Sequence, residues 1–328
     1  MTGASEGSGY LAVDSGGSGL RAVVGTAERG PLARRESREP VRTGERGIDP
    51  EHFMTHLVPL VRALAAEAGT VRLTTVVVGA TGLASLGDGL RAELPGALAR
   101  EWGVRRVALA ADAVTAYVGA LGPRPGAVIA GGTGLIAVGT DLTGWRRADG
   151  WGHLLGDCGS GAWIGRAGLE AALRAHDGRE GGSAGLLACA EEVFGPVAGL
   201  PAALYPRADR PAVLASFAPR VAACADEDPV AAGILRAAAR HMADSATAVC
   251  PSGGEPCVAL TGGLFKLGDP LLGPLEEELA RRLPQVRRVP AEGDPLHGSV
   301  RIAAELSTGS LTLPSDGTML SVTTRSGD

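Results

Sequence analysis

Residues 11–26 read LAVDSGGSGLRAVVGT, and residues 127–140 read AVIAGGTGLIAVGT. Both segments pass from a short apolar run into a Gly-Gly-Ser/Thr-Gly-Leu turn, return through a second apolar run and end in Gly-Thr. Apolar runs bounded by glycine-rich turns predict a strand, a tight turn and a second strand. Because the pattern recurs about a domain length later, we expect a duplicated module, with one copy in each half of the chain.

The length of the chain also favours two domains. The sequence has 328 residues, of which 45% are hydrophobic and 20% charged, and such a chain is too long for one ordinary core. We expect one lobe at residues 10–122, completed by a closing helix at 295–306, and a second lobe at 123–290. Residues 1–9 and 307–328 are expected to be flexible tails.

The predicted elements alternate between strand and helix, which indicates an α/β fold with ligand groups at the carboxyl ends of the strands. Asp49 and Pro50 have the composition of a helix start. Further strands are expected at 71–78, 104–110 and 258–261, and further helices at 91–102, 113–121, 160–175 and 229–249.

Charge and cysteine usage limit the partners. The net charge is −5 with no basic stripe, which argues against nucleic acid and favours a small ligand. The sequence shows no signal-peptide pattern and no 18 uninterrupted apolar residues, so we expect a cytoplasmic protein without a membrane partner. The five cysteines are scattered without a C-x-x-C pair, a pattern typical of reduced thiols.

The two glycine-rich turns are candidate phosphate sites, because closely approaching backbone N–H groups can bind a polyphosphate without a P-loop lysine. The sequence contains no G-x-x-x-x-G-K-[S/T] motif. Residues 17–22 loosely match a dinucleotide fingerprint, but that motif must open a helix, and residues 21–25 have the pattern of a strand. The candidate phosphate ligands are Gly16, Gly17 and Ser18 in the first turn and Gly132, Thr133 and Gly134 in the second.

Three carboxylates are candidates for chemistry. Asp14 ends a strand beside the first turn and could hold Mg²⁺ through water, or could simply cap the turn. Asp112 also follows a strand and suits a general base, with a helix N-cap as the alternative role. Asp157 lies in the segment GWGHLLGDCGS at 150–160, whose glycines and Trp151 are typical of a loop that holds sugar hydroxyls.

Six segments, taken together and in this order, resemble the N-acetylglucosamine kinase family, which is part of the BadF/BadG/BcrA/BcrD-type ATPases. The resemblance covers about residues 10–306. It implies an α/β, two-lobed actin-like ATPase (ribonuclease H-like) fold with duplicated lobes and an interlobe cleft. The segments are 14–21, 111–113, 131–134, 150–160, 260–263 and 295–298.

The resemblance also implies an activity and its residues. ATP with Mg²⁺ would phosphorylate an amino sugar, with the 6-hydroxyl of N-acetylglucosamine or glucosamine as the first expectation, and a homodimer stays open. Asp14 and Ser18 would handle metal and phosphates, and Asp112 would be the base. Gly132 to Gly134 would form the second phosphate turn, and Gly262 and Gly263 would lie against the adenosine. The sugar-binding candidates are Asp112, Trp151, Gly152, Asp157 and Cys158.

Three positions depart from the family pattern. Cys158 stands where the family usually has Glu, and Leu135 stands where its second turn usually continues with Ser. A Gly-x-x-Asn sugar-contact segment is not visible in residues 41–48. The departures concern the sugar more than the nucleotide.

Two other functions fit the same resemblance. One is an ATP-driven activator of a 2-hydroxyacyl-CoA dehydratase or reductase, which would need clustered thiolates for an iron–sulfur cluster. The other is a non-catalytic sugar-sensing protein on the same fold, which would carry a DNA-binding helix pair before its first strand.

Overall fold

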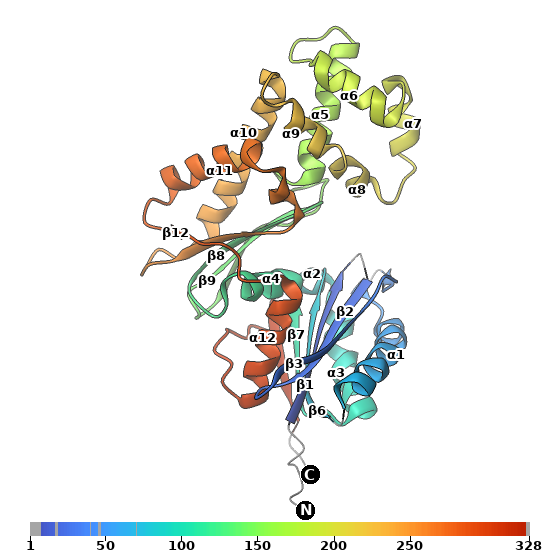
Figure 1. The fold of residues 1–328 in the computed structure, drawn as a ribbon, viewed down its shortest axis with the longest axis vertical. Coiled ribbons are helices and arrows are strands. Elements are labelled where there is room, and N and C mark those ends of the chain that lie inside the picture. The colour runs from blue at the N-terminus through green and yellow to red at the C-terminus, as the bar shows by residue number, and fades with distance from the viewer. Residues whose placement is uncertain (1–7, 17–18, 40, 45–46, 70, 326–328) are drawn as a thin grey trace, which may run out of the picture. The chain divides into compact units, whose positions relative to one another are not determined.

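The computed structural model describes residues 8–16, 19–39, 41–44, 47–69 and 71–325. The chain divides into two compact units, each with its own sheet and its own hydrophobic core (Figure 1). The sequence-based division at 122 differs from the observed one chiefly at residues 140–145, which belong with the first unit. The first unit comprises Met1–Pro125, Thr140–Trp145 and Pro290–Asp328, and the second comprises Gly126–Gly139 and Arg146–Val289.

The first unit is built on a six-stranded sheet in the order β13-β7-β6-β1-β2-β3. β1 and β2 form an antiparallel hairpin, whereas β1, β6 and β7 are parallel, so their carboxyl ends lie at one edge. β4 (Thr43–Gly44) and β5 (Gly47–Ile48) form a separate small hairpin. The sheet strands are β1 (Ser8–Gly16), β2 (Gly19–Thr26), β3 (Gly30–Ser37), β6 (Arg72–Ala80), β7 (Arg106–Ala111) and β13 (Leu320–Thr324).

Helices cover both faces of this sheet (Figure 1). α1 (Pro50–Ala68) and α3 (Asp88–Trp102) share the core with the strands on one face, and α2 (Leu83–Leu86) is a single turn. The predicted start of α1 is confirmed: Asp49 Oδ1 accepts hydrogen bonds from the N–H groups of Glu51 and His52, and Pro50 stands in the first turn. The apolar residues at helical spacing, Phe53, Leu57, Val61 and Leu64, are all buried as that spacing predicts.

α4 (Asp112–Leu121) and α12 (Pro295–Thr308) pack together closely because both carry glycine at the contact. A Cβ on Gly119 would lie 2.1 Å from the Asp294 carbonyl oxygen, and one on Gly298 would lie 1.9 Å from the Thr115 carbonyl oxygen. Asp294 caps α12, since its Oδ1 accepts from the His297 N–H at 2.9 Å. The predicted closing helix is therefore fixed against the helix that begins at Asp112.

The second unit repeats the topology of the first. Its five-stranded sheet has the order β10-β9-β8-β11-β12, which corresponds strand for strand to β3-β2-β1-β6-β7, and β8, β11 and β12 are parallel. The duplication that the two glycine-rich turns predicted is confirmed. The strands are β8 (Gly126–Gly131), β9 (Leu135–Thr140), β10 (Trp145–Asp149), β11 (Cys257–Thr261) and β12 (Arg287–Arg288).

Helices of the second unit bury a core that is rich in leucine and alanine. The long helix α10 contributes Leu235 and Met242, and Phe217 joins them from the segment before α9. The helices are α5 (Gly161–His176), α6 (Ala184–Phe194), η1 (Val197–Gly199), α7 (Leu200–Leu204), α8 (Arg210–Ala215), α9 (Ala218–Cys224), α10 (Pro229–Val249), η2 (Gly263–Leu267) and α11 (Asp269–Arg282).

Three expectations about where ordered structure begins or ends were wrong. The first strand was expected to stop at Asp14, but β1 continues to Gly16 because the hairpin pairs Gly16 with Gly19. The tail after residue 306 was expected to be poorly ordered, yet β13 pairs antiparallel with β7 and buries Leu320. The expected N-terminal tail likewise shortens, since β1 already begins at Ser8.

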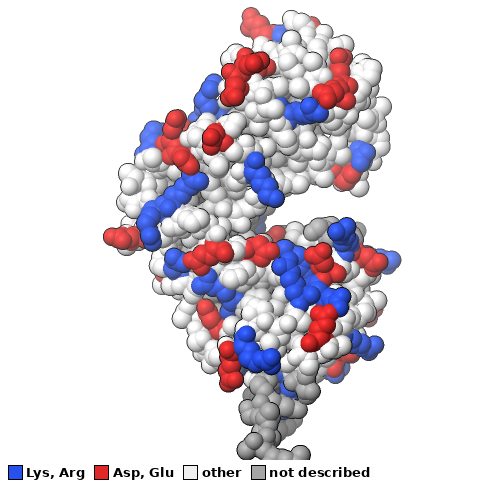
Figure 2. Space-filling model, viewed as in Figure 1, with Lys and Arg blue, Asp and Glu red and all other residues white. Residues whose placement is uncertain are grey.

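Positive and negative side chains are intermingled on the face that Figure 2 shows, in keeping with the net charge of −5. Across the described ranges, no single helix is both long and apolar enough to cross a membrane. One bent pair, Ala184–Phe194 with Val197–Leu204, meets those criteria by length and composition only.

Candidate active site

In the first unit, the predicted turn joins β1 to β2 and places Asp14 near the end of β1. Gly17 and Ser18 lie outside the described residues, so only Gly16 of the first-turn candidates can be placed. The nearest atom to a Cβ on Gly16 would be the Thr81 hydroxyl oxygen, at 3.7 Å. The backbone at Gly16 therefore remains open to an approaching ligand.

Asp14 makes an ion pair that the sequence analysis missed. Arg21 stands opposite it in the hairpin, and the guanidinium donates to Asp14 Oδ2 from Nε at 3.0 Å and from Nη2 at 2.6 Å. The Nη1 of Arg21 donates to Asp294 Oδ2 at 2.7 Å. The hairpin register contained the signal, because a turn that pairs Gly16 with Gly19 also pairs Asp14 with Arg21.

Asp112 is the first residue of α4 and not its N-cap, a position that Ala111 occupies. It follows β7 directly, and its Oδ1 accepts from the Ala113 N–H at 2.9 Å. The Thr81 side chain also hydrogen-bonds to the Asp112 carboxyl. Thr81 in turn donates its backbone N–H to the Ser15 carbonyl at 3.1 Å, which ties the end of β1 to the surroundings of Asp112.

Both carboxyls have raised pKa values. Burial raises the pKa of Asp112 first, the hydrogen bonds from Thr81 and Ala113 oppose this, and the charge of Asp14 raises it further. Burial likewise raises the pKa of Asp14, against the opposing effect of Arg21. The structure thus brings two of the carboxylates that the sequence singled out to one edge of the sheet, at the carboxyl ends of β1 and β7, the two strands that flank β6.

In the second unit, the turn 132–134 is fixed from both sides. The Gly132 N–H donates to the Gly134 carbonyl at 2.9 Å. The N–H groups of Gly161 and Ala162, at the start of α5, donate to the carbonyls of Gly132 and Thr133. The N-terminus of α5 therefore holds the turn, and the turn lies at the carboxyl end of β8.

Asp157 lies against this turn. A Cβ on Gly134 would come within 2.6 Å of Asp157 Oδ2, so only glycine permits the close approach. The Asp157 carboxylate accepts from the N–H groups of Gly152 and Leu135. Burial raises its pKa, those two N–H bonds oppose the rise, and Asp149 adds to it. The predicted sugar-binding carboxylate and the turn predicted to be the second phosphate site therefore form one local assembly.

Asp149 organises the loop and was missed by sequence reasoning. Its Oδ1 accepts from the Asp157 N–H at 2.6 Å, and its Oδ2 accepts from the Cys158 N–H at 2.8 Å. Asp149 has a positive φ of 60°, and Asp157 has one of 53°. Asp tolerates this backbone conformation better than most residues. The Asp-Gly pair at 149–150 was the available signal for such a turn.

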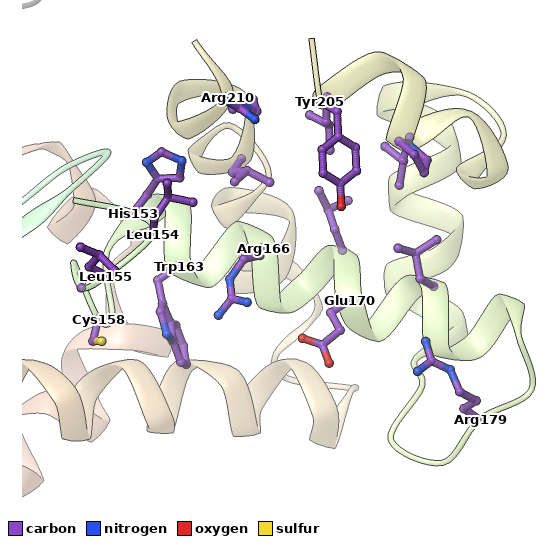
Figure 3. Close-up of a pocket in the computed structure, with 17 residues that line it drawn as sticks. His153, Leu154, Leu155, Cys158, Trp163, Arg166, Glu170, Arg179, Tyr205 and Arg210 are labelled. Carbon is purple, nitrogen blue, oxygen red and sulfur yellow. The ribbon is translucent and has the colours of Figure 1, made fainter. Parts of the chain in front are cut away.

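The rest of the loop presents large side chains to solvent. Trp151 is 65% exposed, with the Arg147 guanidinium carbon 4.3 Å from the centre of its ring. Leu154 and Leu155 are more than 80% exposed. These two leucines and Cys158 line a cavity of about 620 Å³ within the second unit (Figure 3). Burial raises the pKa of the Cys158 thiol, as do the Asp149 and Asp157 carboxylates.

Gly262 and Gly263 follow β11, the neighbour of β8. Gly262 has a φ of 107°, and a Cβ there would lie 2.1 Å from the Gly131 carbonyl oxygen. Gly263 has no atom within 4 Å of the place where a Cβ would stand. The structure therefore brings this pair next to the turn 132–134, with open space beside Gly263.

The repeated sheet order and the paired glycine-rich turns define a two-lobed protein of the actin-like ATPase fold. The chain belongs to the BadF/BadG/BcrA/BcrD ATPase family, whose model matches residues 11–300.

Similar proteins include one curated relative and two solved structures. An N-acetylmuramic acid/N-acetylglucosamine kinase of Clostridium acetobutylicum is 42% identical over 69 residues, which are 21% of this chain and 22% of that protein. The structure of a candidate N-acetylglucosamine kinase from Chromobacterium violaceum is 28% identical, with a TM-score of 0.69, over 90% of this chain and 99% of the other. A candidate N-acetylglucosamine kinase from Porphyromonas gingivalis shares the fold at 17% identity, with a TM-score of 0.65, over 92% of this chain and 100% of the other.

Proposed function

We propose that this protein is an ATP-dependent amino-sugar kinase that transfers the γ-phosphate of ATP to the 6-hydroxyl of N-acetylglucosamine or glucosamine. The observation that carries the proposal is the Asp112 carboxyl, which is largely buried at the start of α4 and held by Thr81 and the Ala113 N–H. A fixed carboxyl suits a general base that accepts a proton from an attacking hydroxyl. The ordered loop at residues 149–158 suits the binding of a sugar that carries this hydroxyl, whereas a hydrolytic ATPase would need only water.

Each unit supplies one part of the proposed reaction. In the first unit, Asp112 accepts the proton of the attacking hydroxyl. The hydroxyl oxygen bonds to the γ-phosphorus of ATP while the bond from that phosphorus to the bridging oxygen breaks, which gives a sugar phosphate ester and ADP. In the second unit, Asp157 and the backbone of the loop at Trp151 and Gly152 bind sugar hydroxyls. The N–H groups of the glycine-rich turns bind phosphate oxygens, and Gly263 leaves room for the adenosine.

The residues present also fit a bound Mg²⁺. Asp14 and Asp112 are close enough that the charge of one raises the pKa of the other, and a divalent cation would relieve that repulsion. In the described ranges, no group of three or more His, Cys, Asp or Glu side chains could hold a metal ion. Mg²⁺ needs few carboxylates because it keeps several waters. When bound, it would neutralise charge on the phosphates, and Asp14 would hold it through water.

The experiment compares Asp112→Asn with the wild-type protein at saturating ATP and N-acetylglucosamine. An amide cannot take the proton, so we expect sugar phosphorylation to fall by about a hundredfold or more. Nucleotide binding, measured by calorimetry, should persist. Asp141→Asn serves as the matched control, because Asp141 lies in an exposed turn and receives its N–H bonds from Thr143 and Gly144. Near-normal phosphorylation by Asp112→Asn would refute the role of Asp112.

A further inference from the structure

Two cysteines of the second unit lie side by side although they are far apart in sequence. Cys189 is in the middle of α6, and Cys224 ends α9, a helix that packs against α6. Their Sγ atoms are 3.7 Å apart, and both residues are half-buried. Two thiols in van der Waals contact need only small side-chain rotations to reach the S–S bond length of about 2.05 Å.

We propose that Cys189 and Cys224 form a redox-sensitive dithiol site that a hydroperoxide oxidises to an intramolecular disulfide. One thiolate attacks the peroxide oxygen, becomes a sulfenic acid and releases water or an alcohol. The second thiolate attacks the sulfenic sulfur and releases water. With hydrogen peroxide, the two thiols and one peroxide thus yield one disulfide and two waters. The proposal does not depend on the proposed kinase function.

The crosslink would act on the cavity that Leu154, Leu155 and Cys158 line. Residues 190–223 would be closed into a loop, and this segment supplies one wall of the cavity described above (Figure 3). The opposite wall comes from α5 and the loop that contains Cys158. Tyr205, in the wall formed by residues 190–223, is 75% exposed. The residues of the segment 190–223 that line the cavity are Leu200, Pro201, Leu204, Tyr205, Arg210 and Leu214.

The surroundings of the pair set its pH dependence. The pKa of Cys224 is raised to about 11, first by burial, then by the adjacent Cys189, and also by the Asp228 carboxylate. Arg220 on α9 opposes this rise, but Arg220 is itself paired with Glu192 on α6. Because the thiolate is the reactive form, crosslinking should accelerate as pH rises from 7 towards that pKa. The reaction with peroxide should therefore be slow at pH 7.

The test treats the intact protein with excess hydrogen peroxide, blocks remaining thiols and maps tryptic peptides without reductant. Arg179, Arg207, Arg220 and Arg236 delimit the two relevant peptides. Peptide 180–207 should appear joined to peptide 221–236, with two hydrogens lost and release by dithiothreitol. We expect this pair to exceed any other cysteine pair by roughly tenfold, given its geometry. Hydrogen exchange of residues 190–223 should slow in the oxidised protein.

Single variants complete the test. Cys189→Ser and Cys224→Ser should each abolish the crosslink and the slowing of exchange, whereas Cys158→Ser should keep both. If peroxide that fully oxidises free glutathione produced no 180–207 to 221–236 linkage, the proposal would be overturned. Equal amounts of several pairings would overturn it as well, because they would show that proximity in the folded unit does not decide the reaction.

Discussion

At the residue scale, the Asp112 carboxyl has a cost in stability that follows from its raised pKa. Burial, the largest cause, disfavours the charged form in the folded protein. A carboxyl with a raised folded pKa stabilises the fold when protonated. That contribution is complete below the unfolded pKa of about 3.9 and is lost as pH rises through the folded value. Above the folded pKa, the ionised Asp112 carboxylate therefore destabilises the folded state relative to a neutral side chain.

We accordingly expect Asp112→Asn to melt at a higher temperature than the wild type at pH 7, although it loses activity. The difference should shrink as pH falls towards the ordinary carboxyl pKa of about 3.9. Thermal unfolding of both proteins at a series of pH values measures this. An Asp112→Asn variant that melts lower at pH 7, or a gap that widens in acid, would contradict the burial of this charge.

Asp149 provides a second test at this scale. Both of its carboxylate oxygens accept backbone N–H groups, from Asp157 and from Cys158. Asn at this position would replace one of the two acceptor oxygens with an NH₂ group. That group is a donor, and it would face a backbone N–H that is also a donor. Hydrogen bonds to a charged group are worth about 1.5–3 kcal/mol, so Asp149→Asn should raise the sugar KM by about tenfold or more and leave the ATP KM nearly unchanged.

The matched control for this test is Asp141→Asn. All the hydrogen bonds that Asp141 receives reach its Oδ1, which an asparagine retains. It should therefore keep both KM values. If the two variants behaved alike in sugar kinetics, the two acceptor oxygens of Asp149 would not be what holds the loop.

The sequence singled out Asp14, Asp112 and Asp157 as candidates because each follows an apolar run or lies among glycines, where a charged side chain is unusual. It could not rank their roles, since pKa values depend on burial and neighbours that meet only after folding. Arg21 and Asp149 were missed for the same reason. Their partners become visible once the hairpin register and the backbone of the loop at 149–158 are known.

At the scale of elements, the contact between α4 and α12 holds the surroundings of Asp14 together, because Asp294 both caps α12 and accepts from Arg21. Gly298→Ala would place a methyl group against the Thr115 carbonyl. We expect unfolding to become easier by about 1–3 kcal/mol, the usual cost of overpacking, measured by denaturant titration.

Gly96→Ala on α3 is the matched comparison for this element. The nearest atom to its new Cβ would be the mobile end of Arg100, at 3.4 Å. Alanine should be neutral or stabilise the helix by up to about 1 kcal/mol. Equal stability of Gly96→Ala and Gly298→Ala would show that the close helix contact is not needed.

Elements with their own local signals were predicted well. α1 has an N-cap, a first-turn proline and apolar spacing, and the two hairpins have their glycine-rich turns. β13 was missed because a Ser- and Thr-rich tail resembles a loop until β7 offers it an edge to pair with. The hydrogen bonds of an edge strand come from its neighbour and are therefore invisible in its own sequence.

At the scale of the whole molecule, duplication explains why the chain carries two glycine-rich turns at equivalent strand ends. Each unit has its own core, so each can position its own set of groups independently. The sequence predicted this architecture because the repeated segment supplies two neighbouring strands at equivalent places in each sheet, β1 and β2 in the first unit and β8 and β9 in the second.

The central claim is that ATP turnover serves an amino-sugar acceptor. The most direct test measures ADP release with glucosamine, N-acetylglucosamine, N-acetylmannosamine, N-acetylmuramic acid and glucose, and assigns any new phosphate ester by NMR. We expect ADP release to rise at least about tenfold with an amino sugar, and we expect a product phosphorylated at the 6-hydroxyl. ATP hydrolysis at the same rate with every sugar and with none, without a phosphorylated sugar, would contradict the claim.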